Sequence, residues 1–197
     1  TTPGAAKWHR SAGAVARSDT RRRVAAGALV EWLPQETMLF DGARATIRLG
    51  VELAEDARFI GWDVTQLGRT ASGERFASGR VQQTLELFRG DAMLWCERAV
   101  LDGGSRALQA GAILAGAPVF GTMIAAGAAV DDGVLAACRA ASPASGVGAV
   151  TRLPQVLVAR YRGHASAAAH AWFAALWSLL RPALAGRPAI PPRIWTT

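Results

Sequence analysis

The sequence has few of the residues that metal sites and disulfide scaffolds need. It contains two cysteines and three histidines among 197 residues. Cys96 and Cys138 are too far apart for a Cys-x-x-Cys pair, and small secreted disulfide scaffolds need denser cysteines. His9, His164 and His170 show neither His-x-His nor His-Glu-x-x-His spacing. We therefore expect free, buried thiols in a reducing compartment, histidines at the surface or at helix ends, and no preformed metal site.

Catalytic motifs are missing as well. The segment from Gly116 to Gly121 has the G-x-x-x-x-G spacing of a phosphate loop, but it lacks the lysine that must reach the phosphates. Gly-x-Ser-x-Gly is absent, so no nucleophile elbow is present. Cys96 lies beside Trp95 in an apolar stretch and is predicted to be a core residue. We predict that the chain is not an enzyme, and a small hydrolase with an unrecognised site is kept as a third alternative.

Lysine is nearly absent, and acidic residues are absent from the last third of the chain. The net charge is +7. Residues 133–197 carry seven arginines and no acid, whereas residues 24–132 carry nine arginines and fourteen acids. A basic pole attracts anions, so a basic binding module for an anionic partner such as nucleic acid is the alternative function. The arginines are dispersed and no nucleic-acid-binding motif accompanies them, so we do not expect a nucleic-acid partner.

One uncharged stretch, residues 107–130, is long enough to span a bilayer. Glycines and Pro118 interrupt it, and its strongly apolar pieces are short. This pattern favours buried strands joined by glycine turns over a spanning helix. The first residues do not resemble a signal peptide. We expect no membrane association and a cytoplasmic location.

Apolar patterning predicts a mainly β chain whose helices come late. Strands are expected at residues 24–33, 45–51, 58–67, 81–88, 93–101 and 156–161. Arg89-Gly90-Asp91 is typical of a hairpin turn.

Two helices are expected towards the C-terminus. A short helix should run from an acidic cap at 131–132 to about residue 141. A longer helix is predicted at 166–180, because its apolar residues recur every three to four positions. Pro182 and Gly186 are expected to close this second helix. Residues 140–149 are predicted to form a loop and residues 187–195 an extended tail.

Polar residues gather in the predicted strand region. Glu36 follows a strand-ending proline, and Asp63, Arg69 and Glu74 lie close together in the sequence beside glycines. One interpretation is ordinary surface charge with local ion pairs, which contributes little to stability. The other is a partner-binding patch or channel lining, since glycine permits close approach of a partner. Glu36, Asp63, Arg69 and Glu74 are therefore the candidate site residues.

Several motifs, in order along the chain, resemble one family. They are Thr1-Thr2-Pro3-Gly4-Ala5-Ala6-Lys7, the run from Gly27 to Thr37, Gly61-Trp62-Asp63, Leu67-Gly68-Arg69, Gly73-Glu74-Arg75-Phe76, and the run from Leu180 to Trp195. Together they resemble the urease accessory protein UreD (UreH) family over essentially the whole chain. Family members are longer and carry strands before the first of these motifs, so an N-terminally shortened form is expected.

The resemblance implies a single UreD-like domain, residues 1–197, with layered, β-helix-like strands and two helices near the C-terminus. It implies a cytoplasmic chaperone for nickel insertion into urease. The implied partners are the apo-urease structural subunits, a UreF-type accessory protein and, through the complex, a UreG-type GTPase. No cofactor is expected to bind tightly, and nickel is expected to pass only transiently.

Overall fold

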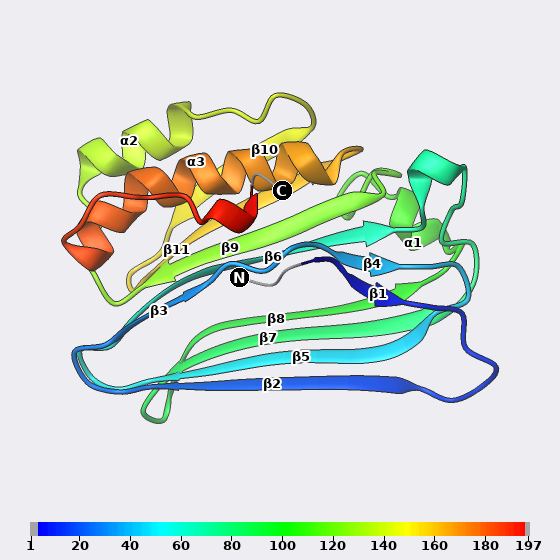
Figure 1. Cartoon of the computed structure of the whole chain (residues 1–197), viewed down its shortest axis with the longest axis horizontal. Helices are drawn as coiled ribbons and strands as arrows, with labels where there is room; N and C mark the ends of the chain where they lie inside the picture. Colours follow the sequence, from blue (N-terminus) through cyan, green and yellow to red (C-terminus); the bar gives the residue numbers. More distant parts are fainter. Residues whose placement is uncertain (1–3, 196–197) are drawn as a thin grey trace.

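Two open β-sheets stack face to face, and the longer helices cover one of them (Figure 1). The computed structural model describes residues 4–195. Thr1, Thr2 and Pro3 of the first family motif therefore lie outside the described residues.

The larger sheet has seven strands in the order β1-β4-β6-β9-β11-β10, and β3 also pairs with β6. Their bounds are β1 Ala6–Trp8, β3 Leu29–Trp32, β4 Thr37–Leu39, β6 Arg58–Leu67, β9 Val119–Ala126, β10 Val147–Arg152 and β11 Val156–Gly163. The smaller sheet has the order β2-β5-β7-β8, with β2 Ala16–Val24, β5 Arg44–Leu53, β7 Arg80–Arg89 and β8 Ala92–Asp102.

From β1 to β7 the chain passes back and forth between the two sheets, and the consecutive strands β3 and β4 make one of these passages together in the larger sheet. Strands β1, β4 and β6 pair in parallel in the larger sheet, and β2, β5 and β7 pair in parallel in the smaller one. Each passage of the chain around both sheets therefore adds one layer, as in a β-helix. The last strands, β8 to β11, pair antiparallel. The layered, mainly β architecture expected from the sequence is confirmed.

The helices are α1 Arg106–Gln109, α2 Asp132–Ala140 and α3 Ser166–Ala185, with short 3₁₀ turns η1 Thr70–Ser72 and η2 Arg193–Trp195. α2 and α3 are the two helices expected near the C-terminus. The Asp131 carboxylate accepts a hydrogen bond from the Val134 amide, which caps α2 as predicted. Among residues 4–195, none of the helices is long and apolar enough to cross a membrane.

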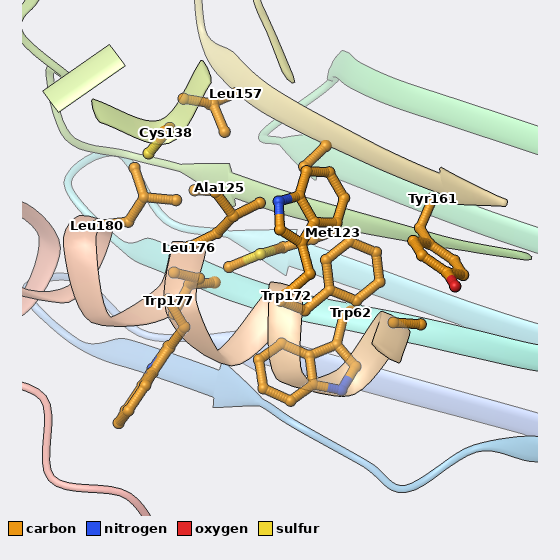
Figure 2. Packing of buried hydrophobic residues seen from close by; sticks show 14 of the residues in the cluster. Trp62, Met123, Ala125, Cys138, Leu157, Tyr161, Trp172, Leu176, Trp177 and Leu180 are labelled. Carbon is orange, nitrogen blue, oxygen red and sulfur yellow. The ribbon is translucent and has the colours of Figure 1, made fainter. Parts of the chain in front are cut away.

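Three apolar clusters hold these layers together. The largest lies between the seven-stranded sheet and helices α2 and α3, and Figure 2 shows Trp62 of β6 packed there with Trp172 and Trp177 of α3. The other two lie between the sheets. One includes Val51 and Leu53 near the end of β5, and the other includes Ala45 near its start. The central stretch of the intersheet space is therefore flanked by two apolar clusters.

The strands at 45–51, 58–67, 81–88, 93–101 and 156–161 are confirmed, as is the hairpin turn between β7 and β8. The strand predicted at 24–33 is wrong as one element. Val24 ends β2, and a turn closed by the Ala28 amide on the Ala25 carbonyl leads into β3. Gly27 adopts φ +71 there, a conformation that side chains disfavour.

Three further predictions need correction. Residues 140–149 are not all loop, because β10 begins at Val147. Residues 187–195 are not wholly extended, because they end in η2. α3 also continues through Pro182 to Ala185, where Gly186 in a left-handed conformation donates its amide to the Pro182 carbonyl. Proline removes one helical hydrogen bond, and burial of Leu184 in the main cluster offsets that loss.

Candidate functional site

A cavity of about 290 Å³ lies between the two sheets. Its polar lining includes Thr20, Thr37, Asp63, Gln83, Glu97 and Thr122, which come from strands of both sheets. Since the clusters at either end of the intersheet space are apolar, these polar groups are concentrated in its centre.

Asp63 is in the middle of β6 and points between the sheets. The Thr37 hydroxyl and the Gln83 amide approach its two carboxylate oxygens at 3.5 Å each. Within residues 4–195 no arginine or lysine forms an ion pair with it. Burial and then the charge of Glu97 raise the pKa of Asp63 from 3.8 to about 6. Asp63 is thus a carboxylate held in the interior without a fixed counter-ion.

Glu97 projects into the cavity from the opposite sheet. Its Oε1 accepts a hydrogen bond from the Thr122 hydroxyl at 3.2 Å and lies 3.6 Å from Arg160 Nη2. The Arg160 guanidinium also stacks over the Trp95 ring, 5.5 Å from its centroid. Glu97 Oε2 is buried and has no hydrogen-bond partner among the described residues. A buried oxygen of this kind is rare in folded proteins and available to a ligand.

Glu36 lies in the segment between β3 and β4, where pairing with β6 is interrupted. β3 pairs with β6 as far as Gly61, and β4 resumes pairing at Thr65, so the break lies opposite Trp62, Asp63 and Val64. This break brings the Glu36 carboxylate to 3.3 Å from Nε2 of His170 on α3. The contact with His170 lowers the pKa of Glu36.

Glu36 and Asp63 belong to one neighbourhood. Thr37, which follows Glu36, reaches Asp63, and the charge of His170 acts on both carboxylates. Gln35, beside Glu36, lines the cavity. The sequence predicted that Glu36 follows a strand and that Asp63 lies within the strand 58–67 near a glycine, and both positions are confirmed.

Arg69 and Glu74 form a separate pair beyond the end of β6. Arg69 donates to the two Glu74 oxygens through Nε at 3.1 Å and Nη2 at 3.2 Å. The Arg69 guanidinium also stacks over the Phe40 ring. Val64 to Leu67 of β6, about 13 Å of strand, and then Gly68 separate Arg69 from Asp63. The four candidates therefore do not form one patch, and the Arg69–Glu74 pair matches the interpretation of a local surface ion pair.

The sequence did not single out Glu97, Gln83 or His170. Glu97 was missed because Cys96 was predicted to face the core. That prediction is wrong: Cys96 is exposed, while Ala99 and Leu101, at even spacing from Glu97, face the other sheet. The sequence did contain a signal for Glu97. Every second residue of a strand lies on the same face, so the apolar Leu101, four positions after Glu97, indicated that Glu97 faces inward. Both thiols are free, as expected, and Cys138 is buried.

The arrangement offers oxygen ligands rather than a closed metal site. Within residues 4–195 no group of three or more His, Cys, Asp or Glu side chains is placed to hold a metal. Two facing carboxylates with hydroxyl and amide oxygens can bind a divalent cation loosely, because oxygen ligands exchange readily.

Comparison with known proteins gives the family. The family model described as UreD urease accessory protein matches residues 1–196. This chain belongs to the UreD urease accessory protein family. The resemblance inferred from the motifs is confirmed, and the family is one of accessory proteins rather than of catalytic enzymes.

The relatives are named Urease accessory protein UreD and are longer than this chain. The protein of Dechloromonas aromatica is 49% identical over 201 residues, and that match covers 100% of this chain and 70% of the relative. The proteins of Nitrosococcus oceani and Pseudomonas aeruginosa are each 48% identical and likewise match 100% of this chain. The chain spans 66% of the first of these two and 70% of the second.

Proposed function

We propose that this chain acts in urease maturation as a cytoplasmic scaffold through which nickel reaches apo-urease. The observation that carries the proposal is Asp63, a partly buried carboxylate without a fixed counter-ion that faces Glu97 across the cavity. Within the UreD family, such a pair suits the transient passage of a divalent cation better than permanent storage.

The energetics of Asp63 support a functional role. A buried carboxylate without a counter-ion destabilises a fold, and its replacement by a neutral residue is often harmless or stabilising. Strongly perturbed acidic groups cluster at functional sites for this reason. A divalent cation would supply the missing charge, and its departure would leave Asp63 free to take up a proton.

The partners that we propose are those implied by the family. They are the apo-urease structural subunits, a UreF-type accessory protein and, through the complex, a UreG-type GTPase. In such an assembly the cavity would lie along the path between the protein that delivers nickel and the urease site that receives it.

The test is urease activation in a reconstituted system that contains the partner proteins. Asp63→Asn and Glu97→Gln keep side-chain shape but remove the charge, and we expect each to lower the yield of active urease at least tenfold. Glu74→Gln is the matched control, because Glu74 is outside the cavity, and it should activate normally. Thermal melts must show that the variants fold, and pull-downs must show that they bind their partners. Full activation by folded Asp63→Asn would refute the role of the cavity.

The alternative, a basic module for an anionic partner, is weakened by the ion pairs of the C-terminal third. Arg152, Arg160 and Arg181 lie 2.7, 3.6 and 3.0 Å from Asp132, Glu97 and Glu31 respectively. All three acids come from the acidic middle of the sequence. The uneven charge of the sequence is therefore partly neutralised when the chain folds. Salt-dependent binding to duplex DNA would restore the alternative.

A further inference from the structure

The contact between His170 and Glu36 does not have the geometry of an ordinary hydrogen bond. His170 Nε2 is a buried atom without a hydrogen-bond partner among the described residues, although Glu36 Oε2 is only 3.3 Å away. A charge-assisted N–H···O bond is normally about 2.7–2.9 Å long. The two atoms are in contact, but the approach is longer than a strong charge-assisted hydrogen bond.

Their separation is that of two ligands on one metal ion. Histidine nitrogen and carboxylate oxygen both lie about 2.0–2.2 Å from a bound first-row divalent cation such as Zn²⁺. At the 90–110° angles of octahedral or tetrahedral coordination, two such ligands are about 3.0–3.5 Å apart by trigonometry on those bond lengths. Nε2 and Oε2 therefore need almost no movement to bind one ion together.

The surrounding residues hold the pair in place and leave part of each side chain exposed. The His170 ring packs edge-on against Trp62, with centroids 6.4 Å apart. Trp62 in turn donates its indole N–H to the Pro34 carbonyl at 2.9 Å, which anchors the segment that carries Glu36. About one fifth of each ligand side chain remains exposed. Such outer contacts orient metal ligands in proteins.

We propose that Glu36 and His170 form an outer binding site for a borderline divalent cation of the nickel type, on the α3 side of the break between β3 and β4. Imidazole selects such ions over magnesium, which prefers oxygen ligands and retains its water. Two protein ligands leave several positions open, so water or a donor from a partner protein completes the site. The path inward passes Thr37, which follows Glu36 and contacts Asp63.

The direction of transfer, from Glu36 and His170 to Asp63, rests on the function proposed above. The binding site itself does not, because its evidence is the geometry of the two side chains. The test therefore measures cation binding by this chain alone and needs no urease.

The experiment follows the imidazole signals of the three histidines by NMR while Ni²⁺, which is paramagnetic, is added to the full chain. We expect the His170 signals to broaden first, at nickel concentrations at least fivefold below those that affect His9 and His164. Glu36→Gln should raise the nickel concentration for half-broadening of His170 at least fivefold. His164→Asn is the control that should leave the His170 response unchanged, and Mg²⁺ should cause no shift of the His170 signals.

Several results would overturn the site. One is simultaneous broadening of all three histidines, another is an unchanged response in Glu36→Gln, and a third is an equal response to Mg²⁺. Each would show that Glu36 and His170 form only an ion pair and not a cation site. Glu36→Gln retains shape and is expected to fold, so the test does not depend on a variant of His170. If nickel does not broaden His170 first but Asp63→Asn still blocks activation, the outer site is refuted and the role of the cavity is supported. If nickel broadens His170 first but Asp63→Asn activates urease fully, the outer site is supported and the proposed function is refuted.

Discussion

Replacing Asp63 by asparagine should stabilise the protein at neutral pH. The pKa of Asp63 in the fold is about 6 against an ordinary value of 3.8. At 1.36 kcal/mol per pKa unit, ionising Asp63 inside the folded protein costs about 3 kcal/mol. Asparagine fills the same space and can still bond to Thr37 and Gln83, but it carries no charge.

The sign follows from linkage. The folded state holds the Asp63 proton more tightly than the unfolded state, so the unfolded chain loses that proton first as the pH rises. The contribution of Asp63 to stability is fully present below about pH 4, declines as the pH rises to about 6, and is lost above that. The advantage of Asp63→Asn should therefore be near zero at pH 4 and reach about 3 kcal/mol by pH 7.5.

Thermal melts of both proteins between pH 4 and pH 8 measure this difference. For a chain of this length, about 3 kcal/mol corresponds to a rise in Tm of roughly 6–12 °C. Glu97→Gln should reduce the pH dependence, because the charge of Glu97 is the second cause of the raised pKa. The reasoning is refuted if Asp63→Asn is less stable than the parent at pH 7.5, or if the difference does not change with pH.

Three further changes test other parts of the structure. Gly61→Ala should cost about 1–3 kcal/mol by urea unfolding, because its Cβ would lie 2.7 Å from the Trp32 carbonyl; unaltered stability would mean that β3 shifts freely. Glu31→Gln should cost about 1–3 kcal/mol in the same assay, since it weakens the bonds to Arg181, and a loss below 0.5 kcal/mol would contradict this. Arg69→Ala should leave urea unfolding nearly unchanged and urease activation intact, because exposed ion pairs contribute little; a failure of activation would show that this pair has a functional role.

Regular patterns made much of the fold predictable. β6 was predicted with its observed bounds, because its β-branched and aromatic residues are followed by Gly68 and preceded by a turn. α2 was predictable from its acidic cap. The part of β2 before Val24 was missed, because it carries four arginines and owes its strand conformation to pairing with β5. Tertiary pairing overrides weak local preference in such strands.

The site was less predictable than the fold. Asp63 and Glu36 were singled out from local sequence, but their connection depends on the break between β3 and β4 and on the position of α3. Glu97 is 34 positions beyond Asp63 and reaches it only because β8 is in the opposite sheet. No local pattern encodes such a contact, and His170, on a helix more than a hundred residues away, is equally invisible.

The break between β3 and β4 has a consequence for the motions of β6. One edge of β6 is paired with β9 from Phe59 to Gln66, whereas the other edge has no strand partner at Trp62, Asp63 and Val64. Amide protons bonded to β9 should exchange with solvent only when the whole fold opens, and those facing the break should exchange through small local openings. Hydrogen exchange along this one strand would then report two free energies. The smaller would measure how readily the backbone beside Asp63 opens without global unfolding.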